Sequence, residues 1–205
     1  MVGRPRTISD ADILVGAARA VNQHGPAGLT LATVANEVGL APATLVQRFG
    51  SKRGLLLTLT RHSVASTTQQ FAAAYARGGL PLSTLVDVLV DMTQSITSPE
   101  ELANNLAFLQ FGLADPEFHR FARDHARVMR AEIWTLLDAA VEQDELINSN
   151  TGRLSRSLHV TYNGSLVAWA IDRKGPLAAY LRDDLETTLL PYRPSSPDRD
   201  RVPMP

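Results

Sequence analysis

The chain has 205 residues, of which 44% are hydrophobic and 20% are charged, and its mean hydropathy is -0.06. This composition excludes a largely disordered chain and supplies enough apolar side chains for a buried core. The absence of cysteine excludes disulfides, thiolate metal sites and a cysteine nucleophile, and it fits a reducing compartment. No apolar run approaches the roughly 18 residues of a membrane span, and Asp10 and Asp12 interrupt the candidate signal-peptide stretch. We therefore expect a cytoplasmic protein that does not enter the membrane.

The charge is unevenly distributed, although the formal net charge is only -1. Residues 1–56 carry six basic and three acidic side chains, whereas the rest carries fourteen basic and eighteen acidic ones. A basic N-terminal unit on an acidic body is expected when one end of a protein contacts phosphate.

Apolar residues recur three and four positions apart and no alternating strand pattern appears, which predicts an all-α fold of about nine helices. The first helix begins after Ser9, which forms a capping-box pair with Asp12, and ends at Gly25-Pro26. The following helices are expected over residues 31–38, 42–49, 52–76, 82–96, 99–115, 117–146, 153–172 and 177–190. Residues 191–205 hold five of the twelve prolines and are expected to form a disordered tail.

Residues 30–49 predict a helix-turn-helix unit: a short helix, the tight turn Gly39-Leu40-Ala41, and a second short helix from Pro42. Gly39 supplies the positive φ that ends the first helix, and the small Ala35 allows the two helices to approach. A second helix of this kind fits the major groove of B-DNA. The expected core of the unit consists of Ile13, Ala17, Val21, Val34, Ala35, Val38, Leu40, Leu45 and Phe49. The alternative is a helical hairpin that only packs.

Residues 30–57, TLATVANEVGLAPATLVQRFGSKRGLLL, resemble the N-terminal signature of the TetR (tetracycline-repressor-like) family of transcription factors. The resemblance rests on Thr30, Val34-Ala35, Gly39, Thr44-Leu45, Phe49 and Ser51-Lys52, and the close match covers about a quarter of the chain. It implies a three-helix DNA-binding domain over residues 1–52. It also implies a larger helical effector-binding and dimerisation domain over residues 53–190, with the tail at 191–205.

The resemblance also implies roles for single residues. Lys52, Thr44 and Thr33 match positions that grip phosphate, and Pro42, Ala43 and Gln47 match positions that face the groove. Val46 stands where many relatives carry an aromatic residue, and Ala41 stands where Ser often caps the helix, a loss of about 0.5–2 kcal/mol. Arg4 and Arg6 are candidates for the adjacent minor groove, although this terminus could equally be only a soluble end. The expected DNA contacts are therefore Arg4, Arg6, Thr30, Thr33, Pro42, Ala43, Thr44, Val46, Gln47, Arg48 and Lys52.

For the body, the resemblance implies a homodimer through the last two helices and an effector pocket among the middle helices. The candidate dimer residues are Gly164, Ser165, Ala168, Leu177, Leu181, Leu185 and Thr188. The candidate pocket residues are Phe71, Met92, Phe108, Phe111, His125, Trp134, His159, Tyr162 and Trp169. For both sets the alternative is packing within one chain, and His125 and His159 are expected to be hydrogen-bonded core histidines rather than metal ligands.

The sequence thus favours a ligand-responsive homodimeric repressor that binds a palindromic operator and is released by a small, largely apolar molecule. No metal or cofactor is expected. An enzyme is disfavoured because the chain has no glycine-rich phosphate loop, no G-x-S-x-G elbow and no H-E-x-x-H motif. The second alternative is a helical module that binds a small molecule or a partner protein without binding DNA.

Overall fold

The computed structural model describes residues 8–147 and 149–194. Over these residues the chain forms nine α-helices and a short 3-10 helix without any strand, which confirms the predicted all-α fold. No helix of the described part is long and apolar enough to cross a membrane. The helices are α1 (Asp10–Gly28), α2 (Leu31–Glu37), α3 (Pro42–Phe49), α4 (Lys52–Arg77), α5 (Pro81–Asp91), α6 (Pro99–Ala114), α7 (Pro116–Glu142), α8 (Thr151–Asp172) and α9 (Leu177–Leu189).

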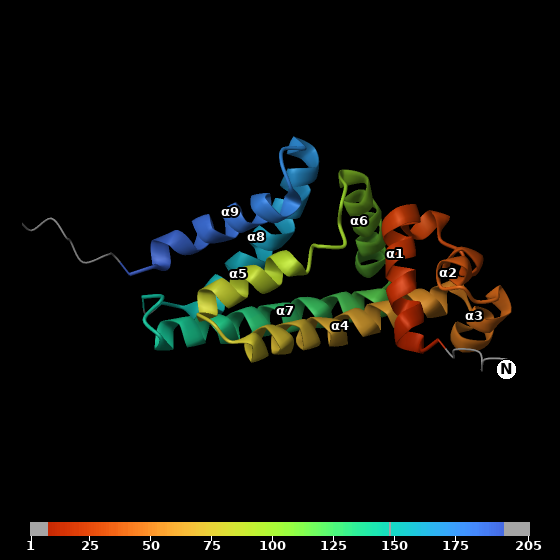
Figure 1. Ribbon diagram of the computed structural model, residues 1–205, viewed down its shortest axis with the longest axis horizontal. Helices are drawn as coiled ribbons and strands as arrows, with labels where there is room; N and C mark the ends of the chain where they lie inside the picture. Colours follow the sequence, from red (N-terminus) through yellow and green to blue (C-terminus); the bar gives the residue numbers. More distant parts are fainter. Residues whose placement is uncertain (1–7, 148, 195–205) are drawn as a thin grey trace, which may run out of the picture.

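Helices α1, α2 and α3 lie together at one end of an elongated molecule (Figure 1). The long helices α4 and α7 pack against each other and run from this end into the body. Helices α5 and α8 pack on that pair, and α9 packs on α5 and α8. Helix α6 stands between α1 and α8 and contacts both. We call α1–α3 the head and the remaining helices the body.

The head has the small core that the sequence predicts. Ile13, Ala17, Val21, Val34, Ala35 and Leu45 are buried, and Val38, Leu40 and Phe49 pack against them. The same core also contains Leu55 and Leu59 of α4 and Phe118 of α7. The apolar core of the head therefore extends past residue 52 into the body, because α4 continues from one into the other without a break.

Helix α1 is interrupted at Gly25, where φ is +64°, as the sequence predicts, and one further turn follows to Gly28. One helix end differs from the prediction where a distant residue intervenes. Helix α5 ends at Asp91 instead of 96. Beyond that point the hydroxyl of Thr93 donates to the carbonyl of Val90, and the amide of Asn22 on α1 donates to the carbonyl of Ser95.

Three further ends were misplaced by a few residues. Helix α7 ends at Glu142, and Asp144 adopts a positive φ of 58°. Helix α8 begins at Thr151 because the side chain of Asn150 caps it. The predicted tail does not begin at residue 191, since Leu190–Tyr192 forms the 3-10 helix and the carbonyl of Tyr192 accepts from the backbone of Ile147. The remainder of that tail, residues 195–205, lies outside the described residues.

Candidate nucleic-acid interface

Helix α2 is fixed at its start by a capping box. The backbone N–H of Thr33 donates to Oγ1 of Thr30 at 3.0 Å, and the backbone N–H of Thr30 donates to Oγ1 of Thr33 at 2.9 Å. The Thr33 hydroxyl also donates to the carbonyl of Thr30 at 2.8 Å. Both hydroxyls therefore already have partners within the protein, and their first role is to set the direction of α2.

The turn between α2 and α3 is tight because Gly39 adopts a φ of +68°. The backbone N–H of Leu40 then donates to the carbonyl of Ala35 at 2.9 Å, which closes the end of α2. Glycine at position 16 of α1 permits the close approach of this corner, since a Cβ there would overlap the side chain of Val38.

Helix α3 begins with Pro42, and its N-cap Ala41 makes no side-chain capping bond, as expected from the sequence. Leu45 is completely buried and Phe49 is partly buried in the head core. The opposite face is exposed and carries the three predicted groove-facing residues, Pro42, Ala43 and Gln47, together with Val46. Val46 is 51% exposed, so the surface of α3 offers small and polar groups around one short apolar side chain.

The contact between α3 and α4 depends on Gly54. A Cβ at this position would overlap the carbonyl oxygen of Phe49, which is backbone and cannot rotate away. Ser51 caps α4 by accepting from the backbone of Gly54 at 3.1 Å. The local sequence Phe49-Gly50-Ser51-Lys52-Arg53-Gly54 therefore sets how α3 is presented.

The two basic residues expected to contact DNA from this region already have intramolecular partners. Arg48 donates to the carbonyl of Ile8 at 2.7 Å and to the Asp10 carboxylate at 3.0 Å, so it ties α3 to the start of α1. Nζ of Lys52 donates to the carbonyl of Ala27 at 3.3 Å and remains partly accessible at the surface. The structure thus gives Arg48 a positioning contact that the sequence did not indicate, because Asp10 is distant along the chain.

Arg53 is a residue that the sequence reasoning did not select. Its guanidinium binds the Asp115 carboxylate at 2.6 Å and the Glu117 carboxylate at 2.9 Å, and it lies over the ring of Phe118. The hydrogen bond from Arg53 lowers the pKa of Asp115, with further help from the backbone N–H groups of Glu117 and Phe118. This contact, which we call the Arg53 clamp, joins the first turn of α4 to the corner between α6 and α7.

The remaining residues predicted to contact DNA differ in how exposed they are. Thr44 is partly buried on α3, and Thr30 is exposed at the start of α2. Arg4 and Arg6 lie outside the described residues. The part of the predicted interface that the structure brings together is therefore the outward face of α3 with Lys52 beside it.

The predicted pocket residues lie in several parts of the body. Phe71 is completely buried in the body core, and Met92 and Tyr162 pack against that core. Phe108 and Phe111 pack against Phe118 near the head. Trp169 is buried near the end of α8, where its indole N–H donates to the carbonyl of Gly175.

Three of the polar candidates lie inside the body. Nε2 of His125 is 3.1 Å from the hydroxyl of Thr67, and burial lowers the pKa of His125. Burial, together with the nearby charge of Arg130 and with His125, lowers the pKa of His159 to about 4. Burial raises the pKa of Tyr162 to about 12. All three side chains are therefore uncharged at neutral pH.

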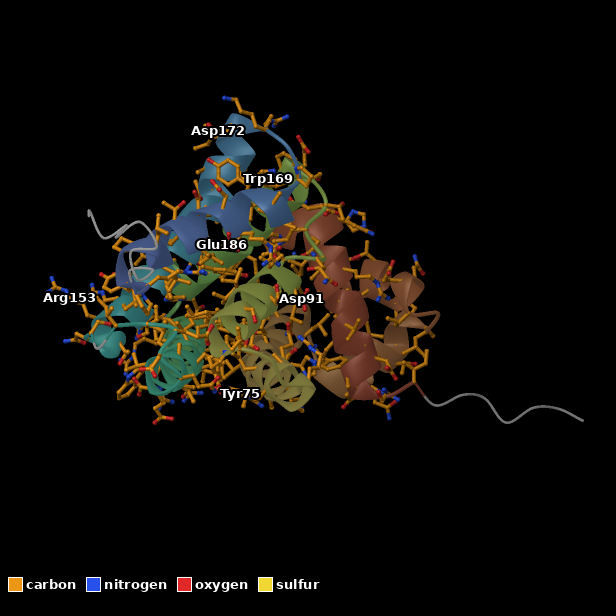
Figure 2. All side chains as sticks on the ribbon, turned by 60° about the vertical axis from the view of Figure 1, so that its left-hand side comes forward. Tyr75, Asp91, Arg153, Trp169, Asp172 and Glu186 are labelled. Atoms are coloured by element: carbon orange, nitrogen blue, oxygen red, sulfur yellow. The ribbon has the colours of Figure 1, made fainter. Side chains whose placement is uncertain are left out.

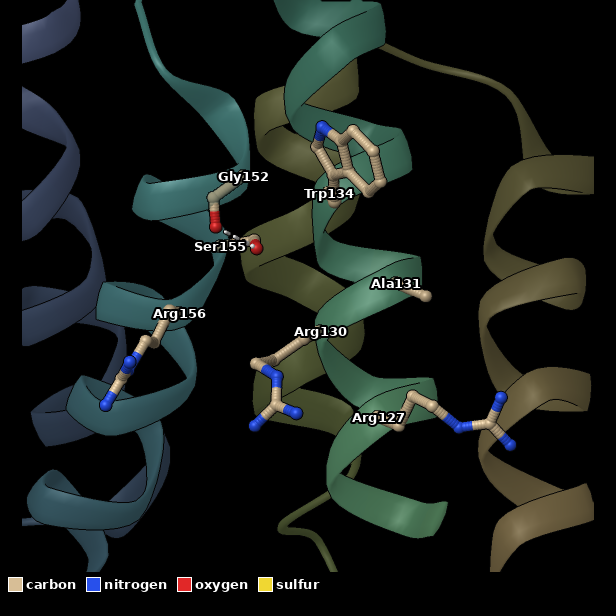
Figure 3. A pocket seen from close by; sticks show the side chains of 7 residues that line it. All are labelled: Arg127, Arg130, Ala131, Trp134, Gly152, Ser155 and Arg156. Atoms are coloured by element: carbon tan, nitrogen blue, oxygen red, sulfur yellow. Dashed lines mark hydrogen bonds between the residues drawn. The ribbon is translucent and has the colours of Figure 1, made fainter. Parts of the chain in front are cut away.

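Trp134, another of the predicted pocket residues, lines a surface groove. This open groove between α7 and α8 has a volume of about 720 Å³ (Figure 3). Its walls contain Arg127, Arg130, Ala131, Trp134, Gly152, Ser155 and Arg156. The sequence reasoning missed the arginines because they are separated by the turn between the two helices.

The predicted dimer residues divide into two groups. Leu177, Leu181 and Leu185 are buried against the chain's own helices, and Ser165 and Thr188 make hydrogen bonds within the chain. Gly164 is exposed and Ala168 is partly exposed on the outer side of α8. In Figure 2, Arg153 lies at one end of α8, and Trp169 and Asp172 lie at the other.

A short helix that turns a small polar face outward from a three-helix core defines a helix-turn-helix DNA-binding protein. The sequence profile of "Bacterial regulatory proteins, tetR family" matches residues 13–59. The transcriptional regulator BetI of Brucella anthropi is 24% identical over 82% of this chain and 84% of its own length. Residues 13–59 therefore form a DNA-binding domain of the TetR type, as the N-terminal sequence predicted, and most of the chain is similar to HTH-type transcriptional regulators.

Solved structures share the fold over nearly the whole chain. A TetR transcription regulator from Haloarcula marismortui superposes with a TM-score of 0.73 at 17% identity, covering 90% of this chain and 98% of that one. A transcriptional regulator from Saccharomonospora viridis in complex with choline gives a TM-score of 0.71 at 19% identity, covering 88% and 95%.

Proposed function

We propose that this protein is a homodimeric repressor that inserts α3 of each copy into a palindromic operator and is released when a small molecule binds the body. The observation that carries the proposal is the exposed face of α3, held outward by the buried Leu45. One helix of eight residues reaches only a few base pairs, so two heads about one helical turn apart are needed for a specific site.

On the DNA, Gln47 is suited to pair with the N6 and N7 edge of adenine, and Val46 is suited to contact a thymine methyl group. Lys52 and Thr44 would hold the flanking phosphates and fix the position of the head without reading sequence. Arg4 and Arg6 would extend the contact into the neighbouring minor groove.

The dimer surface proposed here is the outward face of α8. Val160, Gly164, Val167 and Ile171 follow one another at intervals of four, three and four residues, which places them on one face of the helix. Val160 is 63% exposed and Ile171 is 75% exposed, and nothing lies within 4 Å of a Cβ built on Gly164. A second copy packed on this stripe would remove it from water, whereas the predicted leucines of α9 already serve the chain's own core.

The release mechanism proposed here uses the rigid connection between body and head. Helix α4 belongs to both parts, and the Arg53 clamp fastens its first turn to the corner between α6 and α7. A ligand that binds one arrangement of the body helices better than another would shift the spacing of the two heads. The choline-bound relative supports a small-molecule effector for this fold.

Binding to duplex DNA tests the proposal. Operator sequences would be selected from genomic fragments, and affinity would then be measured by fluorescence anisotropy at several salt concentrations. We expect the logarithm of the affinity to fall linearly with the logarithm of salt, and Lys52→Ala to reduce the slope by about 1. Gln47→Ala should cost about 1–3 kcal/mol at one base position and little elsewhere.

Lys174→Ala is the matched control, because Lys174 is the second of the two lysines and is exposed after α8. It should leave the slope unchanged. Absent or salt-insensitive DNA binding would contradict the proposal and favour a helical module that binds only small molecules or proteins.

A further inference from the structure

The groove between α7 and α8 carries positive charge that the protein does not neutralise. Figure 3 shows Arg130 reaching from α7 toward α8, and Arg156 on α8 with its guanidinium directed away from Arg130. Among the described residues, neither guanidinium has a carboxylate within 4.0 Å. Arg127 differs, since it pairs with Asp124 at 3.3 Å and is directed to the other side of α7.

Other features of the groove add to this positive field. The first turn of α8 lies in the wall, and a helix N-terminus carries a partial positive charge. His159, which is close enough to Arg130 for the two to interact electrostatically, is neutral at pH 7. The carboxylate of Asp138 accepts from the Thr151 hydroxyl near Trp134 and is not part of the groove wall. Arg130 and Arg156 are therefore the wall residues whose charge has no carboxylate within 4.0 Å among the described residues.

An apolar wall stands beside the arginines. The indole of Trp134 is 50% exposed, yet its Nε1–H donates to the Thr151 hydroxyl at 3.0 Å, which fixes the orientation of the ring. Ala131, one turn earlier on α7, is exposed and small. A large aromatic side chain held rigidly at the surface offers contact area at little cost in entropy.

We infer that this groove binds an anionic organic effector, with its carboxylate or phosphate gripped by Arg130 and Arg156 and its flat apolar part resting on Trp134. Guanidinium groups bind both kinds of anion through paired N–H donors, which are charge-assisted and directional. The inference rests on the proposed function and names the chemical class of its effector. The same field repels quaternary ammonium ligands.

A ligand in the groove would lie next to the proposed dimer contact on α8. Arg156 and Val160 line a second hollow on the outer side of α8, so the anion site adjoins the proposed dimer stripe. An anion that bridges α7 and α8 would favour one spacing of these helices. This spacing determines how the α8 stripes of two copies meet, and thus the distance between the heads.

Calorimetric titration of the full chain tests the inference with three matched probes: 2-naphthoate, 2-naphthyl phosphate and the neutral 2-naphthylmethanol. We expect at least one anion to bind about tenfold or more tightly than the alcohol, and the better anion identifies the head group. Arg130→Gln and Arg156→Gln should each weaken the binding of that anion by about tenfold. Arg173→Gln, at the other end of α8, is the matched control and should change nothing.

Thermal melting of each variant would show that it is folded, since exposed arginines away from the core contribute little to stability. Equal binding of anions and alcohol, or anion binding that survives both substitutions in folded protein, would overturn the inference. Operator binding measured in parallel separates the two proposals. Intact operator binding without anion preference defeats this inference alone, whereas arginine-dependent anion binding without DNA binding defeats only the regulator mechanism.

Discussion

Helices α3 and α8 both turn one face outward, but they expose opposite chemistry. Helix α3 shows Ala43, Gln47 and one half-exposed valine, whereas α8 shows a continuous apolar stripe from Val160 to Ile171. Small and polar groups allow a helix to enter a DNA groove, while an exposed apolar stripe is stable in water only when a partner covers it. Exposure alone therefore does not define an interface. The chemical type of the exposed side chains indicates whether DNA or a second protein surface covers them.

The two helices also differ in what holds them. Helix α3 is short and is fixed by single contacts: Arg48 with Asp10, and the close approach of Phe49 to Gly54. Helix α8 is long and is fixed by a buried face that includes Leu154, Leu158 and Trp169. We therefore expect one substitution to displace α3, whereas α8 should tolerate changes on its outer face without unfolding.

The largest expected effect is the loss of the dimer when α8 is made polar. Val167→Glu combined with Ile171→Glu places two charges on the proposed contact. The double variant should be a folded monomer by sedimentation and should bind the operator at least about 100-fold more weakly, because the second head no longer binds from the same molecule. Leu113→Glu, which alters an equally exposed apolar residue on α6, is the control. A dimeric double variant would exclude α8 as the contact.

The opposite effect is expected when α3 is displaced and α8 is left intact. Gly54→Ala introduces a methyl group against the backbone of Phe49, and overpacking of this kind costs about 1–3 kcal/mol. We expect operator binding to be lost while sedimentation still shows a dimer. Gly152→Ala, at the start of α8 and outside both the head and the α8 stripe, is the matched control, since an added Cβ there meets only the Asn150 side chain at an ordinary contact distance. Full operator affinity of Gly54→Ala would show that the junction does not set the position of α3.

A smaller effect is expected from pH, and it concerns the body. Burial holds the pKa of His159 at about 4 in the folded chain, against 6.5 for the free side chain. Between these values the unfolded state binds more protons, so stability falls as pH decreases through this range. Between pH 7 and pH 5, the wild type should lose about 1 kcal/mol of unfolding free energy that His159→Gln does not lose. Urea denaturation measures this difference, and the exposed His24→Gln should behave like the wild type.

The smallest effect on stability is expected at the Arg53 clamp, because its charged groups are exposed to solvent. Arg53→Gln should raise the pKa of Asp115 toward its ordinary value, which NMR titration of the carboxyl carbon would detect. The stabilising contribution of the ionised Asp115 is present at neutral pH and is lost only as pH falls through its lowered pKa. An unchanged Asp115 titration in the variant would show that the clamp is not formed in solution.

Much of the head could be predicted from sequence because its signals are local. The Ser9–Asp12 box, Gly39, Pro42 and the apolar spacing around Leu45 each act within a few residues, and the structure has all of them. The end of α5 was misplaced where a distant group intervenes, since Asn22 of α1 donates to the carbonyl of Ser95. The contact of Arg48 with Asp10 was missed for the same reason, since nothing near Arg48 in the sequence indicates Asp10.

The sequence by itself determined the number of helices, the helix-turn-helix and its TetR type, because periodicity, caps and turn residues are local. The tertiary structure decided which apolar face of α8 and α9 belongs to the chain's own core and which is left at the surface. It also brought Arg130 and Arg156 to one groove and Arg53 to Asp115. Helical periodicity shows that a face is apolar, but only the packing of other helices decides what covers it.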